Sequence, residues 1–157
     1  MSFPSKNFST IEKLKIVHID LSGHARSKGF YGERYFMIFV DDFTRMMWVA
    51  FLKEKLEAFE KFKIFKNKVE NESGVKIKSL RSDRGGEFTS REFNIYYEEH
   101  GIRRQLFSPF SLEQNGITDG RNKSIVEATR AMLFENDVPK TFWREVVNTI
   151  VYTLNRL

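Results

Sequence analysis

Hydrophobic and polar residues in the first third of the chain follow the pattern of extended strands. Residues 14–21 alternate and are rich in branched side chains, which favours a strand. Residues 34–40 are almost continuously apolar, as expected for a strand covered on both faces. Residues 46–52 form a third such run, and the Asp41-Asp42 pair before it predicts a turn. These patterns predict three antiparallel strands.

The spacing of apolar residues changes after residue 54. They recur every three or four positions among lysines and glutamates, which predicts an amphipathic helix ended by Ser73-Gly74. The stripe expected to be buried is Leu56, Phe59, Phe62, Phe65 and Val69. The intervening lysines are interpreted mainly as an exposed helix face rather than a DNA contact: Lys61, Lys63, Lys66 and Lys68.

Two strands and three helices complete the pattern. The strands are predicted at residues 75–80 and 102–107, and the helices at 91–99, at about 114–134 and after Pro139, with a loop over 108–116. The long helix is expected to bury Ile125, Ala128, Thr129, Met132 and Leu133, and the last helix Trp143, Val146, Val147, Ile150, Val151 and Leu154. Strand–helix–strand connections favour parallel pairing. The predicted fold is α/β, a mixed five-stranded sheet flanked by helices.

Composition narrows the functional classes. The length of 157 residues fits one domain, with residues 1–12 as a polar lead-in and 13–157 as a folded core that is cut short at its C-terminal end. The absence of cysteine excludes disulfides and thiolate metal sites. No apolar run is long enough to predict a transmembrane helix. The net charge of +5 is compatible with a nucleic-acid partner.

Two aspartates follow predicted strands that are expected to be neighbours. Asp20 lies near the end of the first strand, and Asp83 lies just beyond the fourth. If those strands are parallel, both carboxylates emerge at one sheet edge, where a divalent cation such as Mg²⁺ or Mn²⁺ would neutralise them. A turn or helix-capping role is the alternative for each aspartate alone. Gly85-Gly86 lacks the Walker pattern and is interpreted as a tight turn beside this site.

Several short motifs occur in a fixed order along the chain. They are Val17 to Leu21 (VHIDL), Tyr35 to Trp48 with DDFTR inside, Leu80 to Phe88 (LRSDRGGEF), His100-Gly101-Ile102, Ser108-Pro109, Gln114-Asn115-Gly116 and Phe142-Trp143. Together they resemble the integrase core domain of copia-type long-terminal-repeat retrotransposons and, more loosely, retroviral integrases, over residues 14–157. The resemblance implies a ribonuclease-H-like fold and a polynucleotidyl transferase or endonuclease.

The resemblance also implies three catalytic acids. Asp20 matches the first and Asp83 the second, while Asp119 stands where the family has a glutamate. Asp reaches roughly 1 Å less far than Glu, and Gly120 replaces the usual arginine at a cost of about 1 kcal/mol in a helix. Two readings stay open. A backbone shift lets Asp119 bind a metal ion such as Mn²⁺, or the site of this copy is impaired.

The implied reaction is two-metal phosphoryl transfer, comprising 3′-end processing of element DNA and strand transfer into target DNA. With Mg²⁺ or Mn²⁺, Asp20 is assigned to both ions, Asp83 to one and Asp119 to the other. Element ends and target DNA are the implied partners of a homo-oligomer that acts inside the cell, in the nucleus or in cytoplasmic particles. The alternatives are a catalytically dead nucleic-acid-binding module and another metal nuclease of this fold, against which Gln114-Asn115-Gly116 argues.

The expected DNA contacts surround the third acidic position: Asn115, Arg121, Asn122 and Lys123. Asn122 and Lys123 follow Asp119 by three and four residues, so all three share a helix face. Lys123 is therefore the main candidate for a phosphate contact, with a solvated lysine as the alternative. Arg103-Arg104 either contacts DNA or simply ends a strand.

Overall fold

The computed structural model describes the chain outside residues 1–11, 24, 26–27, 30, 84 and 107–111, with only the backbone for 112–119. The predicted lead-in therefore lies almost wholly outside the described residues. The strands are β1 (Ile16–Gly23), β2 (Tyr35–Asp41), β3 (Met47–Leu52), β4 (Ser79–Ser82) and β5 (Arg103–Leu106). The α-helices are α1 (Ala58–Ser73), α2 (Arg91–His100), α3 (Leu112–Glu135) and α4 (Trp143–Leu154), and the 3-10 turns are η2 (Lys55–Glu57), η3 (Gly86–Phe88) and η4 (Lys140–Phe142).

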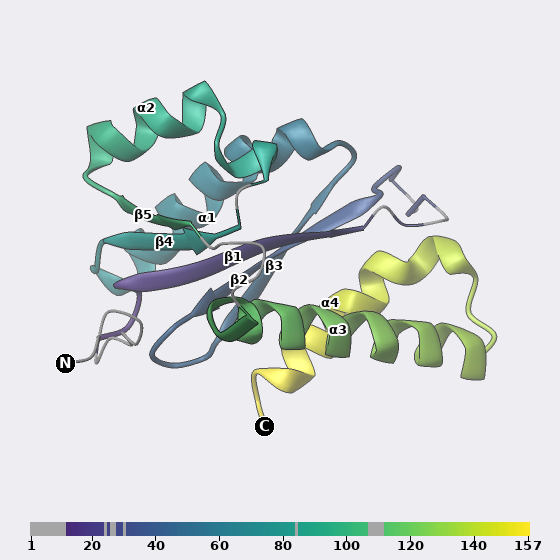
Figure 1. Ribbon diagram of the computed structural model, residues 1–157. Helices are drawn as coiled ribbons and strands as arrows, with labels where there is room; N and C mark the ends of the chain where they lie inside the picture. The colour runs from purple at the N-terminus through teal and green to yellow at the C-terminus, as the bar shows by residue number, and fades with distance from the viewer. Residues whose placement is uncertain (1–11, 24, 26–27, 30, 84, 107–111) are drawn as a thin grey trace.

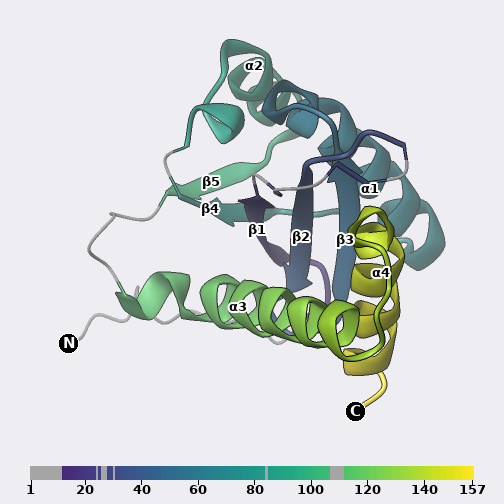
Figure 2. The same ribbon diagram turned by 90° about the vertical axis from the view of Figure 1, so that its right-hand side faces the viewer.

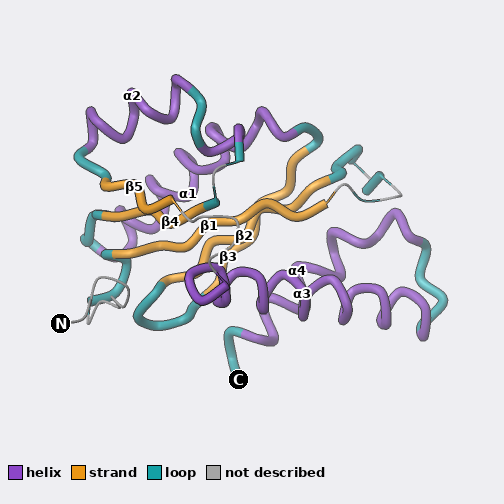
Figure 3. Tube along the Cα trace, viewed as in Figure 1, coloured by secondary structure: helices purple, strands orange, loops and turns teal. Residues whose placement is uncertain are grey.

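The strands form one mixed sheet in the order β3-β2-β1-β4-β5 (Figure 3). β1 pairs with β2 and β2 with β3 in antiparallel fashion. β4 pairs with β1, and β5 with β4, in parallel fashion. The predicted mixed five-stranded sheet, with three antiparallel strands and two parallel additions, is confirmed. β1 lies at the centre of the sheet, with its antiparallel partner β2 on one edge and its parallel partner β4 on the other.

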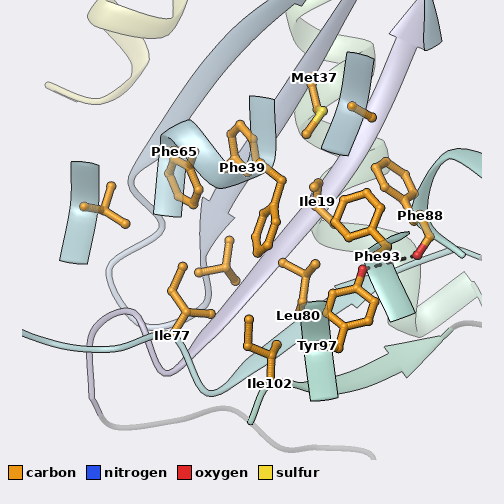
Figure 4. Packing of buried hydrophobic residues seen from close by; sticks show 14 of the residues in the cluster. Ile19, Met37, Phe39, Phe65, Ile77, Leu80, Phe88, Phe93, Tyr97 and Ile102 are labelled. Carbon is orange, nitrogen blue, oxygen red and sulfur yellow. Dashed lines mark hydrogen bonds between the residues drawn. The ribbon is translucent and has the colours of Figure 1, made fainter. Parts of the chain in front are cut away.

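Helices cover both faces of the sheet, α1 and α2 on one side and α3 and α4 on the other (Figures 1 and 2). Alternate residues of the central strands point to opposite faces of the sheet and belong to two separate apolar clusters. In the first, the rings of Phe39 and Phe65 stack with centroids 3.9 Å apart, and the Tyr97 hydroxyl donates to the Phe88 carbonyl (Figure 4). The second packs α3 and α4 around Ile125 and Trp143. Most of the described phenylalanines therefore serve as core residues.

The fourth strand begins later than predicted. Residues 75–80 alternate, yet β4 covers Ser79–Ser82. The reason is visible at Ile77, which is buried but whose backbone N–H donates to the Glu70 carboxylate at 2.8 Å rather than to a neighbouring strand. The fifth strand is also slightly shorter than predicted. The helix predicted from about residue 114 begins at Leu112, so part of the predicted loop over 108–116 is helical.

Two side chains on the first helical segment contradict the predicted burial: one from the apolar stripe and one from the exposed lysine face. Leu56 is 78% exposed, because it lies in η2, where a capping turn between Glu54 and Glu57 precedes α1. Lys66 is buried rather than solvated, and its ammonium lies 2.8 Å from the Glu70 carboxylate. The remainder of the stripe packs in the first cluster as predicted. In the described part of the chain, no helix is both long and apolar enough to cross a membrane.

An ion pair joins α4 to the connection between β1 and β2. The Arg144 guanidinium donates to Glu33 at 2.9 Å, and the Glu33 carboxylate also accepts from the Tyr31 backbone N–H. Burial raises the pKa of Glu33, but hydrogen bonds from its own backbone, Arg144 and Tyr31 outweigh it, so the pKa lies below the ordinary 4.5. The stability contributed by this carboxylate is therefore complete above pH 4.5 and is lost as the pH falls through the lower folded-state pKa.

We expect Arg144→Met to lower the free energy of unfolding by about 1–2 kcal/mol at pH 7, because it leaves the buried Glu33 carboxylate short of a donor. Urea unfolding followed by circular dichroism at several pH values measures the loss. The difference between parent and variant should shrink as the pH falls below 4.5. A difference that stays constant into the acid range would show that Arg144 contributes through packing alone.

Candidate functional site

The parallel pairing of β1 with β4 brings the two predicted aspartates together. The last paired residues of this ladder are His18 and Arg81. Asp20 lies two residues further on within β1 and shares the strand face of His18, and Asp83 lies two residues beyond Arg81. β4 ends at Ser82, whereas β1 continues beyond Asp20 to Gly23. Asp20 thus lies within its strand rather than at the strand end, and Asp83 follows immediately after its own.

Asp20 is half-buried and is held from two directions. Its Oδ1 accepts from the Leu21 backbone N–H at 2.9 Å, and its Oδ2 accepts from the Asn122 side-chain amide of α3 at 2.6 Å. Asn122 is only 9% exposed, and its own Oδ1 is buried with no hydrogen-bond partner. Asn122 therefore connects α3 to the carboxylate of Asp20. The sequence placed Asn122 among the DNA contacts, which stays a prediction, but gave no signal for this contact.

Asp83 is exposed and accepts from the Gly85 backbone N–H at 2.8 Å. A Cβ at Gly85 would lie 1.9 Å from the Glu87 Oε2 atom and 2.9 Å from the Asp83 Oδ1 atom. The two carboxylates therefore lie close to Gly85, and the hydrogen bond from its N–H to Asp83 agrees with the tight turn predicted at Gly85-Gly86. Glu87 is an acidic neighbour of Asp83 that the sequence reading missed, although it lies within the same motif.

The third acidic position lies on α3. The side chains of Asp119 and Asn115 are outside the described residues, so their predicted roles stay predictions. Asn122 follows Asp119 by three residues on the helix, which places both on one face. Because Asn122 contacts Asp20, this face of α3 is turned toward the two aspartates. Gly120 is exposed, and a Cβ added there would meet no atom within 4 Å.

The basic candidates occupy different environments. Lys123 is exposed, and Arg121 is half-buried. Arg103 is exposed at the start of β5, whereas Arg104 donates to Asn94 and lies over the Tyr97 ring at 5.2 Å. Arg104 therefore packs against α2 rather than facing the two aspartates.

The donors near the site are suited to a hard divalent cation. The carboxylates of Asp20 and Asp83 are the oxygen ligands that Mg²⁺ and Mn²⁺ prefer. The unpartnered Asn122 Oδ1 adds a buried acceptor beside Asp20, and such atoms normally bond to an ordered water or another group. Among residues with described side chains, no group of three His, Cys, Asp or Glu residues gathers to hold a metal. The carboxylates of Asp20 and Asp83 therefore fit a divalent ion only if a further ligand completes the coordination of that ion.

The family described as Integrase core domain matches residues 12–111. The Retrovirus-related Pol polyprotein from transposon TNT 1-94 of Nicotiana tabacum is 41% identical over 156 residues, covering 99% of this chain and 12% of that protein. The corresponding polyprotein from transposon RE2 of Arabidopsis thaliana is 40% identical over 124 residues, covering 79% of this chain and 8% of that protein. This chain thus spans a small part of each relative.

Two solved structures share the fold. A chain of the simian T-cell lymphotropic virus intasome in complex with PP2A regulatory subunit B56 gamma superposes with a TM-score of 0.74 at 16% identity, covering 96% of this chain and 51% of that chain. The HTLV-2 integrase catalytic core domain in complex with magnesium, in its trimeric form, gives 0.65 at 20% identity, covering 92% and 86%. The ribonuclease-H-like fold implied by the sequence motifs is confirmed.

We expect Gly120→Ala to raise the free energy of unfolding by about 1 kcal/mol, because alanine restricts the unfolded chain and its Cβ enters open space. Urea unfolding measures the change. Gly101→Ala serves as the opposite control, because Gly101 has a φ of 64° that strains a side chain. A loss of stability in Gly120→Ala would contradict a regular helix at this position.

Proposed function

The chain belongs to the Integrase core domain family, and on that premise we propose that it performs the phosphoryl transfers of DNA integration. These are the trimming of element-DNA 3′ ends and their joining to target DNA. The observation that carries the proposal is the hydrogen bond from Asn122 to Asp20. It supports the proposal because Asn122, three residues after Asp119 on α3, contacts Asp20 on β1, the parallel neighbour of β4.

In this proposal the three aspartates would hold two Mg²⁺ or Mn²⁺ ions. When bound, such ions activate a water or a DNA 3′-hydroxyl and stabilise the leaving oxygen. The protein supplies the fixed positions. Asn122 orients the Asp20 carboxylate, and the Gly85 N–H orients that of Asp83. This preorganisation limits the reorientation required when charge develops on the transferring phosphate.

DNA is the proposed partner, and a multimer is the proposed working form. Lys123 is exposed one helical turn beyond Asp119, where an ammonium would meet a phosphate near the reacting bond. The HTLV-2 core was solved in dimeric and trimeric forms, and the simian virus protein within an intasome. For this chain we propose a homo-oligomer that acts on DNA in the nucleus.

A second candidate function is a nucleic-acid-binding module that has lost catalysis. Asp119 favours it, because the carboxylate is one methylene short of the family's glutamate. Gly120 beside it removes the usual arginine and weakens the helix turn that aims Asp119. The two candidates differ in whether DNA binding depends on the aspartates and whether any variant joins DNA ends.

We expect Asp119→Glu to raise strand transfer by about 10- to 100-fold, because it restores roughly 1 Å of reach. The assay joins a labelled element-end duplex to target DNA with Mn²⁺ and, separately, with Mg²⁺. Asp83→Asn in the same background is the control and should abolish the product. Joining that survives Asp83→Asn would contradict the carboxylate mechanism. DNA binding without joining in the parent and in Asp119→Glu would instead support the non-catalytic module.

We expect Lys123→Ala to weaken DNA binding at all sequences and to reduce the slope of log affinity against log salt by about 1, as for one lost phosphate contact. Fluorescence anisotropy of labelled duplexes at several salt concentrations gives the slope. Lys68→Ala is the matched control, because Lys68 is equally exposed but lies on α1, across the sheet from α3. Equal slopes in the parent and Lys123→Ala would remove Lys123 from the interface.

A further inference from the structure

Asp42 is a buried carboxylate that the metal site does not use. The sequence predicts a turn at Asp41-Asp42, and the chain does turn after β2. However, Asp42 is only 3% exposed, which a turn role does not require. Its backbone N–H donates to the Ile16 carbonyl of β1 at 3.0 Å, so its position relative to β1 is fixed.

The Asp42 carboxylate reaches across β1 toward β4. Its Oδ1 accepts from the His18 Nε2 at 2.8 Å, and His18 is 1% exposed. The Arg81 Nη1 of β4 lies 3.6 Å from the same oxygen, and the Arg45 Nη1 lies 3.7 Å away. Arg81 also donates through Nε to Gln105 of β5 at 2.5 Å. One polar row thus links the end of β2 to β1, β4 and β5.

These charges are costly to bury, so their role is not explained by stability alone. A buried ion pair often gives no more stability than apolar residues of similar volume, but it can specify one arrangement of the chain. Here the row selects a register. A one-residue slip of β4 against β1 would turn Arg81 to the opposite face and leave the Asp42 carboxylate buried without it. Even in the observed register, the His18 Nδ1 atom is buried and unpartnered.

The polar row lies next to the proposed metal site, two residues before it along the chain. His18 and Arg81 are the last paired residues of the β1–β4 ladder. Asp20 lies two residues beyond His18 within β1, and Asp83 lies two residues beyond Arg81, just past the end of β4. Whatever fixes the His18–Arg81 pair therefore limits the separation of these two carboxylates, since each is only two residues from the pair.

We propose that Asp42 is a positioning residue that clamps His18 to Arg81 and thereby sets the spacing of Asp20 and Asp83 for metal binding. This inference rests on the proposed function, because it assigns those two aspartates to one metal site. Asp42 does not bind the metal itself. It acts through the strand register, and its removal should weaken metal binding while the fold persists.

The test measures Mn²⁺ affinity of the 157-residue chain by electron paramagnetic resonance of free Mn²⁺, alongside the thermal unfolding midpoint. We expect Asp42→Ala to weaken Mn²⁺ binding about tenfold, in the range found for supporting residues around metal ligands. Asp42→Asn, which keeps an acceptor oxygen for His18 but loses the charge, should lie between parent and Asp42→Ala. Asp83→Asn identifies the Mn²⁺ signal that belongs to the proposed site.

Asp41→Ala is the matched control. Asp41 is 1% exposed and precedes Asp42, but its carboxylate accepts from the Leu14 backbone and from Thr44 rather than from His18. It should lower the unfolding midpoint and leave Mn²⁺ affinity within about twofold of the parent, well short of the loss in Asp42→Ala.

The outcomes separate the clamp from the proposed function. Parent-like Mn²⁺ affinity in Asp42→Ala, or equal losses in Asp41→Ala and Asp42→Ala, would overturn the clamp and leave the proposed function standing. No Mn²⁺ binding that depends on Asp83 in the parent chain would overturn both. A selective loss in Asp42→Ala, partly restored in Asp42→Asn, supports the clamp.

Discussion

The parallel pairing of β1 with β4 is the contact on which the proposed site depends, because it makes neighbours of the two strands from which Asp20 and Asp83 are positioned. β1 is paired on both edges, antiparallel to β2 and parallel to β4. Its alternate residues serve different purposes. Val17 and Ile19 enter the core beneath α1 and α2, while His18 and Asp20 face the α3 side. The same alternation that builds the core therefore also points the first carboxylate at α3.

The second constraint is the packing of α3 against the sheet face that carries His18 and Asp20. Among its described side chains, the buried ones are Asn122, Ile125 and Thr129, spaced by one helical turn. Ile125 packs in the second apolar cluster, Thr129 is buried, and Asn122 donates its side-chain amide to Asp20. Asp119 lies one turn before this packed segment, and Gly120 lies between them. The buried segment of α3 thus begins just after Gly120, the residue that most weakens the helix backbone.

Asp20 and Asp83 are more exposed to solvent than the residues that support them. Asp83 is exposed, and Asp20 is half-buried, so DNA and ions can approach both. The polar residues that set the strand register lie deeper, with Asp42 and His18 almost wholly buried. Burial makes those interactions rigid, because an unpaired charge in the interior is costly. The proposed site therefore combines accessible carboxylates with a buried support, and Asp42, at the end of β2, comes from neither of the strands next to those carboxylates.

The sequence alone determined the types and order of the elements, the mixed sheet and the parallel pairing of β1 with β4, because periodicity and strand order follow from local backbone geometry. It could not reveal that Leu56 is exposed and that Lys66 and Asp42 are buried. Leu56 is exposed because a local capping turn precedes α1, and Lys66 lies beside Glu70 on the same helix, whereas Asp42 is buried near a guanidinium two strands away. Apolar spacing marks which face of an element is buried, but burial of a charge is decided only when the fold supplies its counter-charge.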